Sequence, residues 1–318
     1  MNSNRNDIHK EAEIFMRVLI VGAGGIGGYF GGRLIEKGED VTFLVRQNRK
    51  QQLDETGLMI ESVHGNMEFK PKTILSGEPA EPFDVILLST KAYHLQGAIE
   101  SMKPYVSENT MILPLLNGIA HVDELRAVFG DERVIGGLCF IETTLDEKGT
   151  VVQTSPIHDL VFGEFSGEQT DRIKKLEETF QGTKASFRLS ENIEQDMWHK
   201  YQFIATLSGV TSIFRAPIGP IRDQEYGLVT IQTLLEEVGN IMRSVDAPLA
   251  NGIEVSQMDK IMQMGYNMKS SLQRDMEKGL KTEAEHFFGY LLQIAKEKQL
   301  RTPVIGTIYA NLEVYEAR

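Results

Sequence analysis

The amino-acid sequence predicts an α/β fold, with an N-terminal doubly wound parallel sheet and an all-helical C-terminal domain. A glycine-rich turn directly follows a short apolar run in Arg17–Gly32, and strand-like and helix-like segments alternate through the first half. Beyond Ser190, the segments with regular apolar spacing have the period of a helix. We therefore expect a disordered leader over 1–15, a sheet domain over 16–189 and a helical domain over 190–318.

The first strand and helix are marked by glycines with distinct physical tasks. Val18–Val21 reads as a buried strand that ends in Gly22-x-Gly24-x-x-Gly27, and helix-compatible sequence continues to Gly38. The first glycine allows a tight turn, the second lets the backbone approach a pyrophosphate, and the third lets the helix pack on the strand. This order predicts a Rossmann-type βαβ unit that binds a dinucleotide. The expected contact residues are Gly22, Ala23, Gly24, Gly25, Ile26 and Gly27.

The remaining strands of the parallel sheet follow as apolar runs. We expect strands at Val41–Val45, within Ile60–Phe69, at Asp84–Thr90 and at Thr110–Leu116. The last two runs are almost continuously apolar, which is typical of parallel strands buried on both faces.

After these strands the pattern of the chain changes. From Arg133 to Phe165 short β-like runs are broken by turns, which predicts an antiparallel extension at the edge of the sheet. A charged helix at Glu168–Gln181 and a short strand at Ala185–Leu189 complete the sheet domain. The segments IQTLLEEVGNIMRSV and EAEHFFGYLLQIAKEKQ, further along, have helical apolar spacing.

The residue that ends the second strand indicates which dinucleotide binds. An NAD site usually has Asp or Glu here, about 20 residues after the glycines, to bind the ribose 2′-hydroxyl. This chain has Arg46, with Arg49 and Lys50 close behind. A guanidinium binds a 2′-phosphate with two hydrogen bonds, whereas a carboxylate would repel it. We expect NADP(H), the alternative being that Arg46 is an ordinary solvated residue.

Polar residues follow three of the expected strands. Arg46 closes one, Lys91 closes DVILLST, and Asn117-Gly118 closes TMILPLL. Ligands of a doubly wound sheet bind outside the carboxyl ends of its strands, so these residues predict a cofactor cleft. We expect Lys91 to contact the phosphates or the ribose, and Asn117 to lie near the nicotinamide. Polar residues also follow strands without any function, which is the alternative for each one taken singly.

Composition limits the other classes of protein. The 318 residues suffice for two domains, and 41% hydrophobic with 25% charged residues is typical of a globular protein. A net charge of −12 argues against nucleic acid or an anionic membrane as partner. No transmembrane run, secretory signal or metal site is expected, and the single Cys139 reads as a small buried residue of a cytoplasmic protein.

The helical domain must supply the chemistry, and Lys200 is the first candidate. It lies beside the apolar stripe formed by Met197, Tyr201, Ile204 and Ser208 on the predicted helix. A lysine in that place often reaches along the stripe to water. If it faces the cleft instead, partial burial would lower its pKa and suit it to deliver a proton.

Glu283 and the serine pair Ser270-Ser271 are the next candidates. Thr282-x-x-Glu285 matches a capping box, in which Glu283 would be an ordinary acid near a helix N-terminus. The serines would serve as a helix cap or as hydrogen-bond donors to a substrate, and the residue pattern leaves both open.

Taken together, the chain resembles the ketopantoate reductase family, the 2-dehydropantoate 2-reductases, from Met16 onward. The matching pieces are VGAGGIGGYFGGRL, the arginine after the second strand, LLSTKAY, LNGIA, DMWHKYQF, SSLQRDMEKGLKTEAEHFFGYL and the TPV of RTPV. The resemblance implies an active site between a Rossmann domain and a helical domain. It also implies NADPH-dependent reduction of a 2-oxo acid, ketopantoate, to a 2-hydroxy acid, (R)-pantoate, as in pantothenate biosynthesis.

The resemblance also implies roles for individual residues. The proton-donating lysine falls on Lys200, and the glutamate linked to substrate and cofactor falls on Glu283. The substrate serine falls on Ser271, the cleft asparagine on Asn117 and the cofactor lysine on Lys91. A small 2-oxo acid is thus the expected partner, and the apolar faces of the helical domain permit a homodimer.

The chain departs from the family at three substrate positions. Asparagines expected four and eight residues after the lysine are Ile204 and Ser208, and a further one is missing near Ile218. Because isoleucine cannot hydrogen-bond a substrate hydroxyl, we expect a more apolar pocket. Each lost polar partner removes on the order of 1–3 kcal/mol of discrimination. The alternatives are a 2-oxo acid with a bulkier apolar tail as substrate, or a non-catalytic NADP-binding regulator.

Overall fold

A computed structural model describes residues 16–317 of the chain, so the leader predicted over 1–15 lies outside the described residues. Its first sheet has five strands, all parallel, in the order β5-β2-β1-β6-β7. The strands within the last two apolar runs, Val85–Leu88 and Met111–Pro114, are buried at every residue, as predicted. The strands are β1 (Arg17–Val21), β2 (Asp40–Leu44), β5 (Lys72–Ile74), β6 (Val85–Leu88) and β7 (Met111–Pro114).

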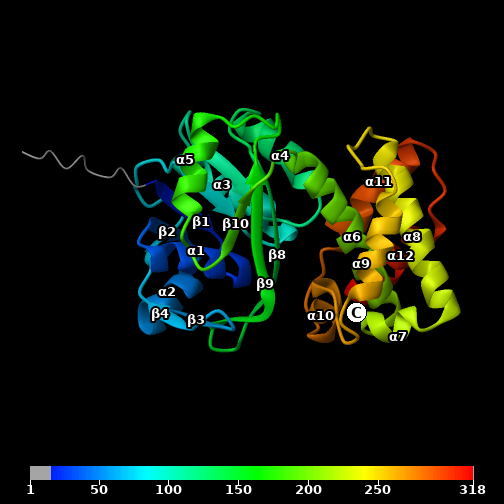
Figure 1. The fold of residues 1–318 in the computed structure, drawn as a ribbon. Helices are drawn as coiled ribbons and strands as arrows, with labels where there is room; N and C mark the ends of the chain where they lie inside the picture. The colour runs from blue at the N-terminus through cyan, green and yellow to red at the C-terminus, as the bar shows by residue number, and fades with distance from the viewer. Residues whose placement is uncertain (1–15, 318) are drawn as a thin grey trace, which may run out of the picture.

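Helices pack on both faces of this sheet, which makes it doubly wound (Figure 1). The long α1 begins at the glycine turn and ends before Gly38, as expected. The helix after β2 was not predicted, because in QNRKQQLDET only Leu53 is buried and no apolar stripe marks it. The helices of this part of the chain are α1 (Gly25–Lys37), α2 (Gln47–Thr56), α3 (Leu95–Met102), α4 (Ala120–Phe129) and α5 (Asp171–Phe180). Of these, α5 packs on the strand Ser186–Leu189, which lies outside this sheet.

The other strands form a second sheet, which corrects the prediction for Arg133–Phe165: only its start, at Val134, pairs with Ile112 at the edge of the first sheet, through a single parallel bridge. β8 does pair antiparallel with β9, but the other edge of β9 pairs in parallel with β3 and with β10. The run Ile60–Phe69, in which one strand was expected, contains the end of one strand and the whole of the next, and these two pair antiparallel in the second sheet. The strands are β3 (Leu58–Ser62), β4 (Met67–Phe69), β8 (Gly136–Leu145), β9 (Val151–Gly163) and β10 (Ser186–Leu189).

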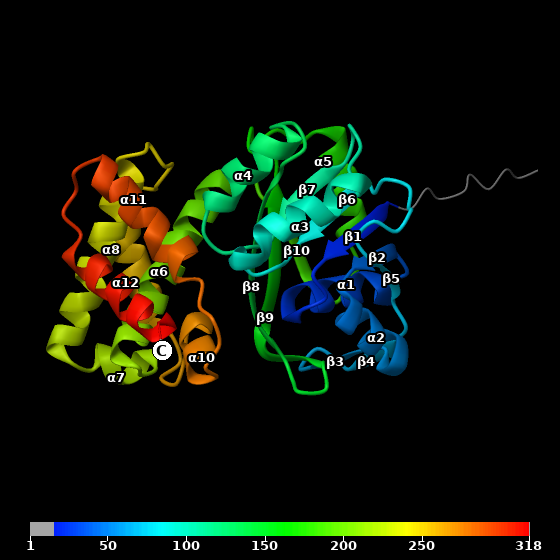
Figure 2. The ribbon, with the colours of Figure 1, turned by 180° about the vertical axis from the view of Figure 1, so that it is seen from behind.

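The described part of the chain after Ser190 contains helices and connecting loops but no strand, as predicted. In both views these helices lie on one side of β8 and β9, with the first sheet on the other side (Figure 1, Figure 2). They are α6 (Ile193–Phe214), α7 (Ile218–Arg222), α8 (Glu225–Arg243), α9 (Ile253–Gln263), α10 (Ser271–Glu277), a π-helical turn (Glu285–Gly289), α11 (Tyr290–Glu297) and α12 (Pro303–Glu316). The domain limit at Ser190 stays a prediction.

Two clusters of buried side chains hold the molecule together. One fills the space between the two sheets and α1, and Phe43 and Leu160 are among its fully buried members. The other begins on the opposite face of the first sheet at Ile86 and continues without a break through Tyr201 of α6 to Leu234 of α8. The helix α6 packs on β8 as well as on α8, α10 and α12, so it joins the sheets to the helices.

Candidate active site

The glycine turn lies at the crevice of the first sheet, and its three glycines differ in their surroundings. Gly22 has φ +98°, a conformation that favours glycine. A Cβ on Gly27 would lie 2.2 Å from Ser89 Oγ and 2.1 Å from the carbonyl oxygen of Gly22. A Cβ on Gly24 would meet nothing within 4 Å. The turn is therefore tight where the helix meets the strand and open where a pyrophosphate would approach, which fits a dinucleotide.

The other turn residues surround this opening. α1 begins at Gly25, where an added Cβ would come within 2.8 Å of Thr143 Oγ1 on β8. Ala23 is buried, its carbonyl oxygen accepts a 3.1 Å hydrogen bond from Arg49 Nε, and Ile26 is half-buried. The helix N-terminus thus faces the crevice between β1 and β6, where the strand order reverses.

Arg46 is the residue directly before α2, at the carboxyl end of β2, and its side chain is exposed. The two neighbouring cations are engaged within the protein. Arg49 turns back to the glycine turn, and Lys50 contacts Asp54 at 3.2 Å. The register of β2, β1, β6 and β7 brings the residues that follow these strands to one edge of the sheet, as predicted for Arg46, Lys91 and Asn117.

Lys91 and Glu283 meet across the two parts of the chain. The Glu283 carboxylate accepts hydrogen bonds from Lys91 Nζ at 3.2 Å and from the backbone N–H of Ala92 at 2.8 Å. Asp275 of α10 also contacts Lys91 Nζ, at 2.8 Å. Burial favours the neutral amine, but the charges of Glu283 and Asp275 outweigh it and raise the pKa of Lys91, so the amine stays protonated.

Lys200 points from α6 toward the end of β7. Its Nζ donates a 2.9 Å hydrogen bond to Asn117 Oδ1, and it lies 5.5 Å from the centre of the Phe140 ring. The residue is only 6% exposed, so it does not reach to bulk water along the helix. Burial lowers the pKa of Lys200, although Cys139 and Glu283 raise it in part. A cationic donor with a lowered pKa is suited to deliver a proton to a developing alkoxide.

The remaining predicted substrate positions differ in exposure. Ile204 lies half-buried one turn beyond Lys200, and Ser208 and Ile218 are buried. Ser271 is exposed in the first turn of α10. The buried Ser270 caps α10, accepting a 3.1 Å bond from the N–H of Gln273. Of the serine pair, Ser270 therefore has the capping role.

The capping box predicted from Thr282-x-x-Glu285 does not form. The Thr282 hydroxyl and N–H both donate to the Glu316 carboxylate of α12, and Glu285 accepts a 2.5 Å bond from the Tyr309 hydroxyl. Both side chains thus take partners from a helix far along the chain. Glu283 therefore has no part in a capping box, and its carboxylate binds Lys91 instead.

Three contacts at the site were not predicted from the sequence. Asp275 completes the ion pair at Lys91, Arg274 forms an ion pair with Glu142 of β8, and His286 contacts the backbone oxygen of Asn117. Only Asp275 could have been noticed in the sequence, as an acid eight residues before Glu283 in the same family segment. The other contacts depend on how α10 and the π-helical turn meet the sheets, which local sequence does not encode.

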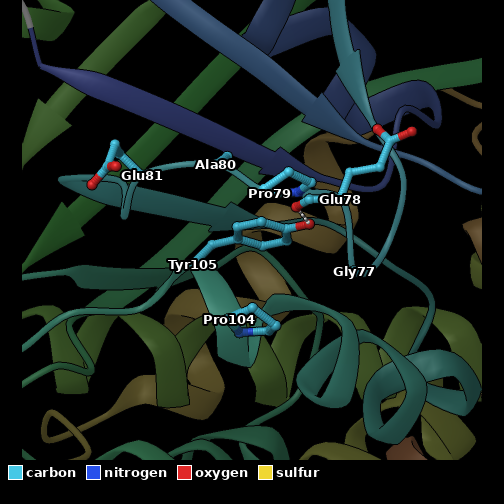
Figure 3. A pocket seen from close by; sticks show the side chains of 7 residues that line it. All are labelled: Gly77, Glu78, Pro79, Ala80, Glu81, Pro104 and Tyr105. Carbon is cyan, nitrogen blue, oxygen red and sulfur yellow. Dashed lines mark hydrogen bonds between the residues drawn. The ribbon is translucent and has the colours of Figure 1, made fainter.

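Two cavities are present whose lining does not include Lys200. One, of about 550 Å³, is lined by residues 77–81, Pro104 and Tyr105 (Figure 3). These residues lead into the amino ends of β6 and β7, whereas Lys91 and Asn117 follow the carboxyl ends. The other, of about 370 Å³, lies between Glu142 and the segment leading into α10. In the described range 16–317, no helix has the length and apolar character needed to cross a bilayer.

A glycine turn at the crevice of a doubly wound sheet, faced by a buried lysine from a helical region, is the arrangement of a dinucleotide-dependent oxidoreductase. Comparison with known proteins identifies which group of oxidoreductases this is. The family model "Ketopantoate reductase PanE/ApbA" matches residues 18–167, and its C-terminal counterpart matches residues 192–316. The chain belongs to the ketopantoate reductase family.

Individual relatives and solved structures differ in the activity that their names give. The chain is 49% identical over 302 residues to the uncharacterized oxidoreductase YkpB of Bacillus subtilis, covering 95% of this chain and 99% of the relative. The crystal structure of 2-dehydropantoate 2-reductase from Geobacter metallireducens has a TM-score of 0.84 at 26% identity, over 94% and 99% of the two chains. A D-mandelate dehydrogenase with NADH and anilino(oxo)acetate has a TM-score of 0.86 at 21% identity, over 95% and 99%, a likeness of fold.

Proposed function

We propose that this chain is an NADPH-dependent reductase that converts 2-dehydropantoate to (R)-pantoate, as in pantothenate biosynthesis in the cytoplasm. The observation that carries this proposal is the buried Lys200, held by Asn117 Oδ1 at 2.9 Å beside the cofactor crevice. A structural lysine would be expected to form an ion pair or to reach water, whereas this amine has only a neutral amide oxygen as its hydrogen-bond acceptor among residues 16–317.

In this proposal NADPH, when bound, supplies a hydride to C2 of the substrate. Lys200 holds its positive charge close to the substrate carbonyl oxygen, stabilises the alkoxide as it develops and then donates the proton. Asn117 orients the Lys200 ammonium. Glu283 binds the cationic Lys91 and the N–H of Ala92, and so fixes the segment after β6 at the edge of the crevice.

The cofactor preference is a further part of the proposal and depends on Arg46. Its exposed guanidinium follows the strand next to β1, where a 2′-phosphate would lie. We expect NADPH to bind much more tightly than NADH, and Arg46→Asp to weaken or reverse this preference, because a carboxylate repels the phosphate. Titration with both cofactors measures the two dissociation constants. Lys103→Asp makes the same charge change at a remote surface site and serves as control; equal affinities in the wild type would end the claim.

The residues of the site support the type of reaction more strongly than they support one particular 2-oxo acid as substrate. Ile204 offers no hydrogen bond, and the Phe140 ring, 39% exposed, lies beside Lys200. These apolar groups favour the second candidate, a related 2-oxo acid with a bulkier apolar tail. A panel of 2-oxo acids, assayed by optical detection of NADPH oxidation, ranks the two. Oxidation with none of them would favour a non-catalytic NADP-binding regulator, a role in which Lys200 and Glu283 would have no use.

Ile204→Asn tests whether this helix face borders the substrate. An asparagine there can hydrogen-bond the hydroxyl of ketopantoate, so we expect kcat/KM for ketopantoate to rise relative to a 2-oxo acid without the hydroxyl. The gain should be about 1 kcal/mol, the net worth of one hydrogen bond. Ile213→Asn, on the same helix at its far end, is the control. An unchanged ratio in a folded variant would remove Ile204 from the pocket.

Other substrate and partner assignments follow from the same proposal. Ser208 and Ser271 are proposed substrate contacts on α6 and α10, and Gly22–Gly27 with Lys91 are proposed cofactor contacts. The formation of a homodimer stays a prediction.

A further inference from the structure

One short segment of the helical region contacts the ends of two neighbouring strands of the first sheet. Glu283 binds the residues that follow β6, and three positions later His286 Nε2 lies 2.6 Å from the backbone carbonyl oxygen of Asn117, which follows β7. β6 and β7 are adjacent and parallel. The segment continues into the π-helical turn Glu285–Gly289, a type of turn that often occurs at functional sites.

The contact of His286 defines its tautomer and its role in packing. A carbonyl oxygen only accepts, so Nε2 must carry the hydrogen and donate it. The ring also stands against Gly118, which has φ +80° and whose Cβ position would be 3.1 Å from Nε2. The imidazole therefore contacts both residues of the Asn117-Gly118 pair, through a hydrogen bond to the first and close packing on the second.

The Asn117 residue is thus bound at both of its oxygens. Its backbone oxygen accepts from His286, and its side-chain oxygen accepts from Lys200 at 2.9 Å. From this geometry we propose that His286 is a positioning residue, which fixes the Asn117 peptide so that the amide oxygen stays on the Lys200 ammonium. The role in turnover rests on the proposed function, whereas the effect on Lys200 itself does not.

His286 is supported in turn by His121 of α4. The two rings lie 5.6 Å apart at an angle of 32°. His121 is fully buried, and neither ring nitrogen has a hydrogen-bond partner among residues 16–317. Burial lowers the pKa of His121 well below its usual value, and the nearby His286 and Lys200 add to this, so His121 stays neutral. A neutral ring lets His286 pack closely without charge repulsion.

The ionisable groups around Lys200 decide what loss of this contact would do. Cys139 on β8, Glu283 and His121 on α4 are the titratable groups that interact with its amine, and His286 lies next to His121. A hydrogen bond accepted from the ammonium favours the charged form, so release of Asn117 would lower the pKa of Lys200 further. Protonated Lys200 would then be lost at a lower pH.

The test compares His286→Phe, which keeps a ring but has no donor, with His286→Gln, whose side-chain N–H can still reach a carbonyl. His64→Phe is a matched control, because His64 Nε2 also contacts a backbone carbonyl, that of Pro156 at 3.0 Å, on the second sheet. Melting temperatures show that each variant folds. Competitive labelling of lysine amines with acetic anhydride across a pH series, read at Lys200 by mass spectrometry, measures its pKa without any substrate.

We expect His286→Phe to move the labelling curve of Lys200 to lower pH and His64→Phe to leave it in place. With the preferred 2-oxo acid, kcat should fall roughly 10-fold in His286→Phe, and the decrease of kcat at high pH should begin at a lower pH. His286→Gln should restore most of the kcat and most of the pH profile. A labelling curve unchanged in folded His286→Phe would overturn the inference. A wild-type protein that reduces no 2-oxo acid would overturn only the proposed function, since labelling still decides the role of His286.

Discussion

Replacement of Lys200 by alanine is expected to lower kcat by roughly 10²–10⁴-fold, the usual contribution of a positioned acid. The dissociation constant for NADPH should change little, because the amine contacts Asn117 of the crevice and not the glycine turn. Stopped-flow measurement of NADPH oxidation, together with a fluorescence titration of cofactor binding, separates the two effects. Removal of a buried amine also removes a cost of burial, so the variant should fold.

The pH dependence of the wild type provides a second readout of the same residue. Reduction requires protonated Lys200, so kcat should fall as pH rises through its pKa, which burial lowers from the usual value near 10.5. In Lys200→Ala this falling limb should disappear. Lys103→Ala, at an exposed lysine whose amine forms an ion pair with Glu100, is the control. Unchanged turnover in Lys200→Ala would mean that the buried amine has a structural role alone.

Gly24→Ala is expected to weaken cofactor binding without loss of stability, whereas Gly27→Ala is expected to destabilise the fold. At Gly24 the added Cβ meets no protein atom within 4 Å, so stability should hold while the methyl occupies the space of the pyrophosphate. We expect NADPH affinity to fall about 10-fold or more, at least about 1.4 kcal/mol. At Gly27 the Cβ would overlap the backbone oxygen of Gly22, and the free energy of unfolding should fall by about 1–3 kcal/mol or more.

Chemical denaturation and cofactor titration of both variants check this contrast. Gly306→Ala, where a Cβ also meets nothing within 4 Å but lies on α12, controls for the change of glycine to alanine itself. Tight NADPH binding by Gly24→Ala would show that the cofactor does not approach this turn. A Gly27→Ala variant as stable as the wild type would show that α1 can shift away from β1.

The features that the sequence predicts well are local. The turn at Gly22–Gly27, the buried strands β6 and β7, and the placement of Arg46, Lys91 and Asn117 after their strands all follow from short patterns. Parallel topology alone brings the ends of such strands to one edge. The roles of Lys200 and Glu283 needed the family resemblance, because each has a common alternative on a helix, in snorkelling or capping.

What the sequence does not predict depends on contacts between distant segments. β8 and β9 read as strands, but which sheet they join is decided by pairing with β3 and β10. Thr282 and Glu285 match a capping box, yet partners from α12 compete for both side chains. His286 carries no pattern of its own, since its partner is a backbone oxygen 169 positions earlier in the chain.

The second hydrophobic cluster has a consequence for how the protein unfolds. It passes without interruption from Ile86 of the first sheet through Tyr201 to Leu234 of the helical region. Two halves with separate cores could melt one after the other, whereas halves that share a core lose it together. The sheet half and the helical half should therefore unfold as one cooperative unit, so that a destabilising change in either half lowers the folded population of both.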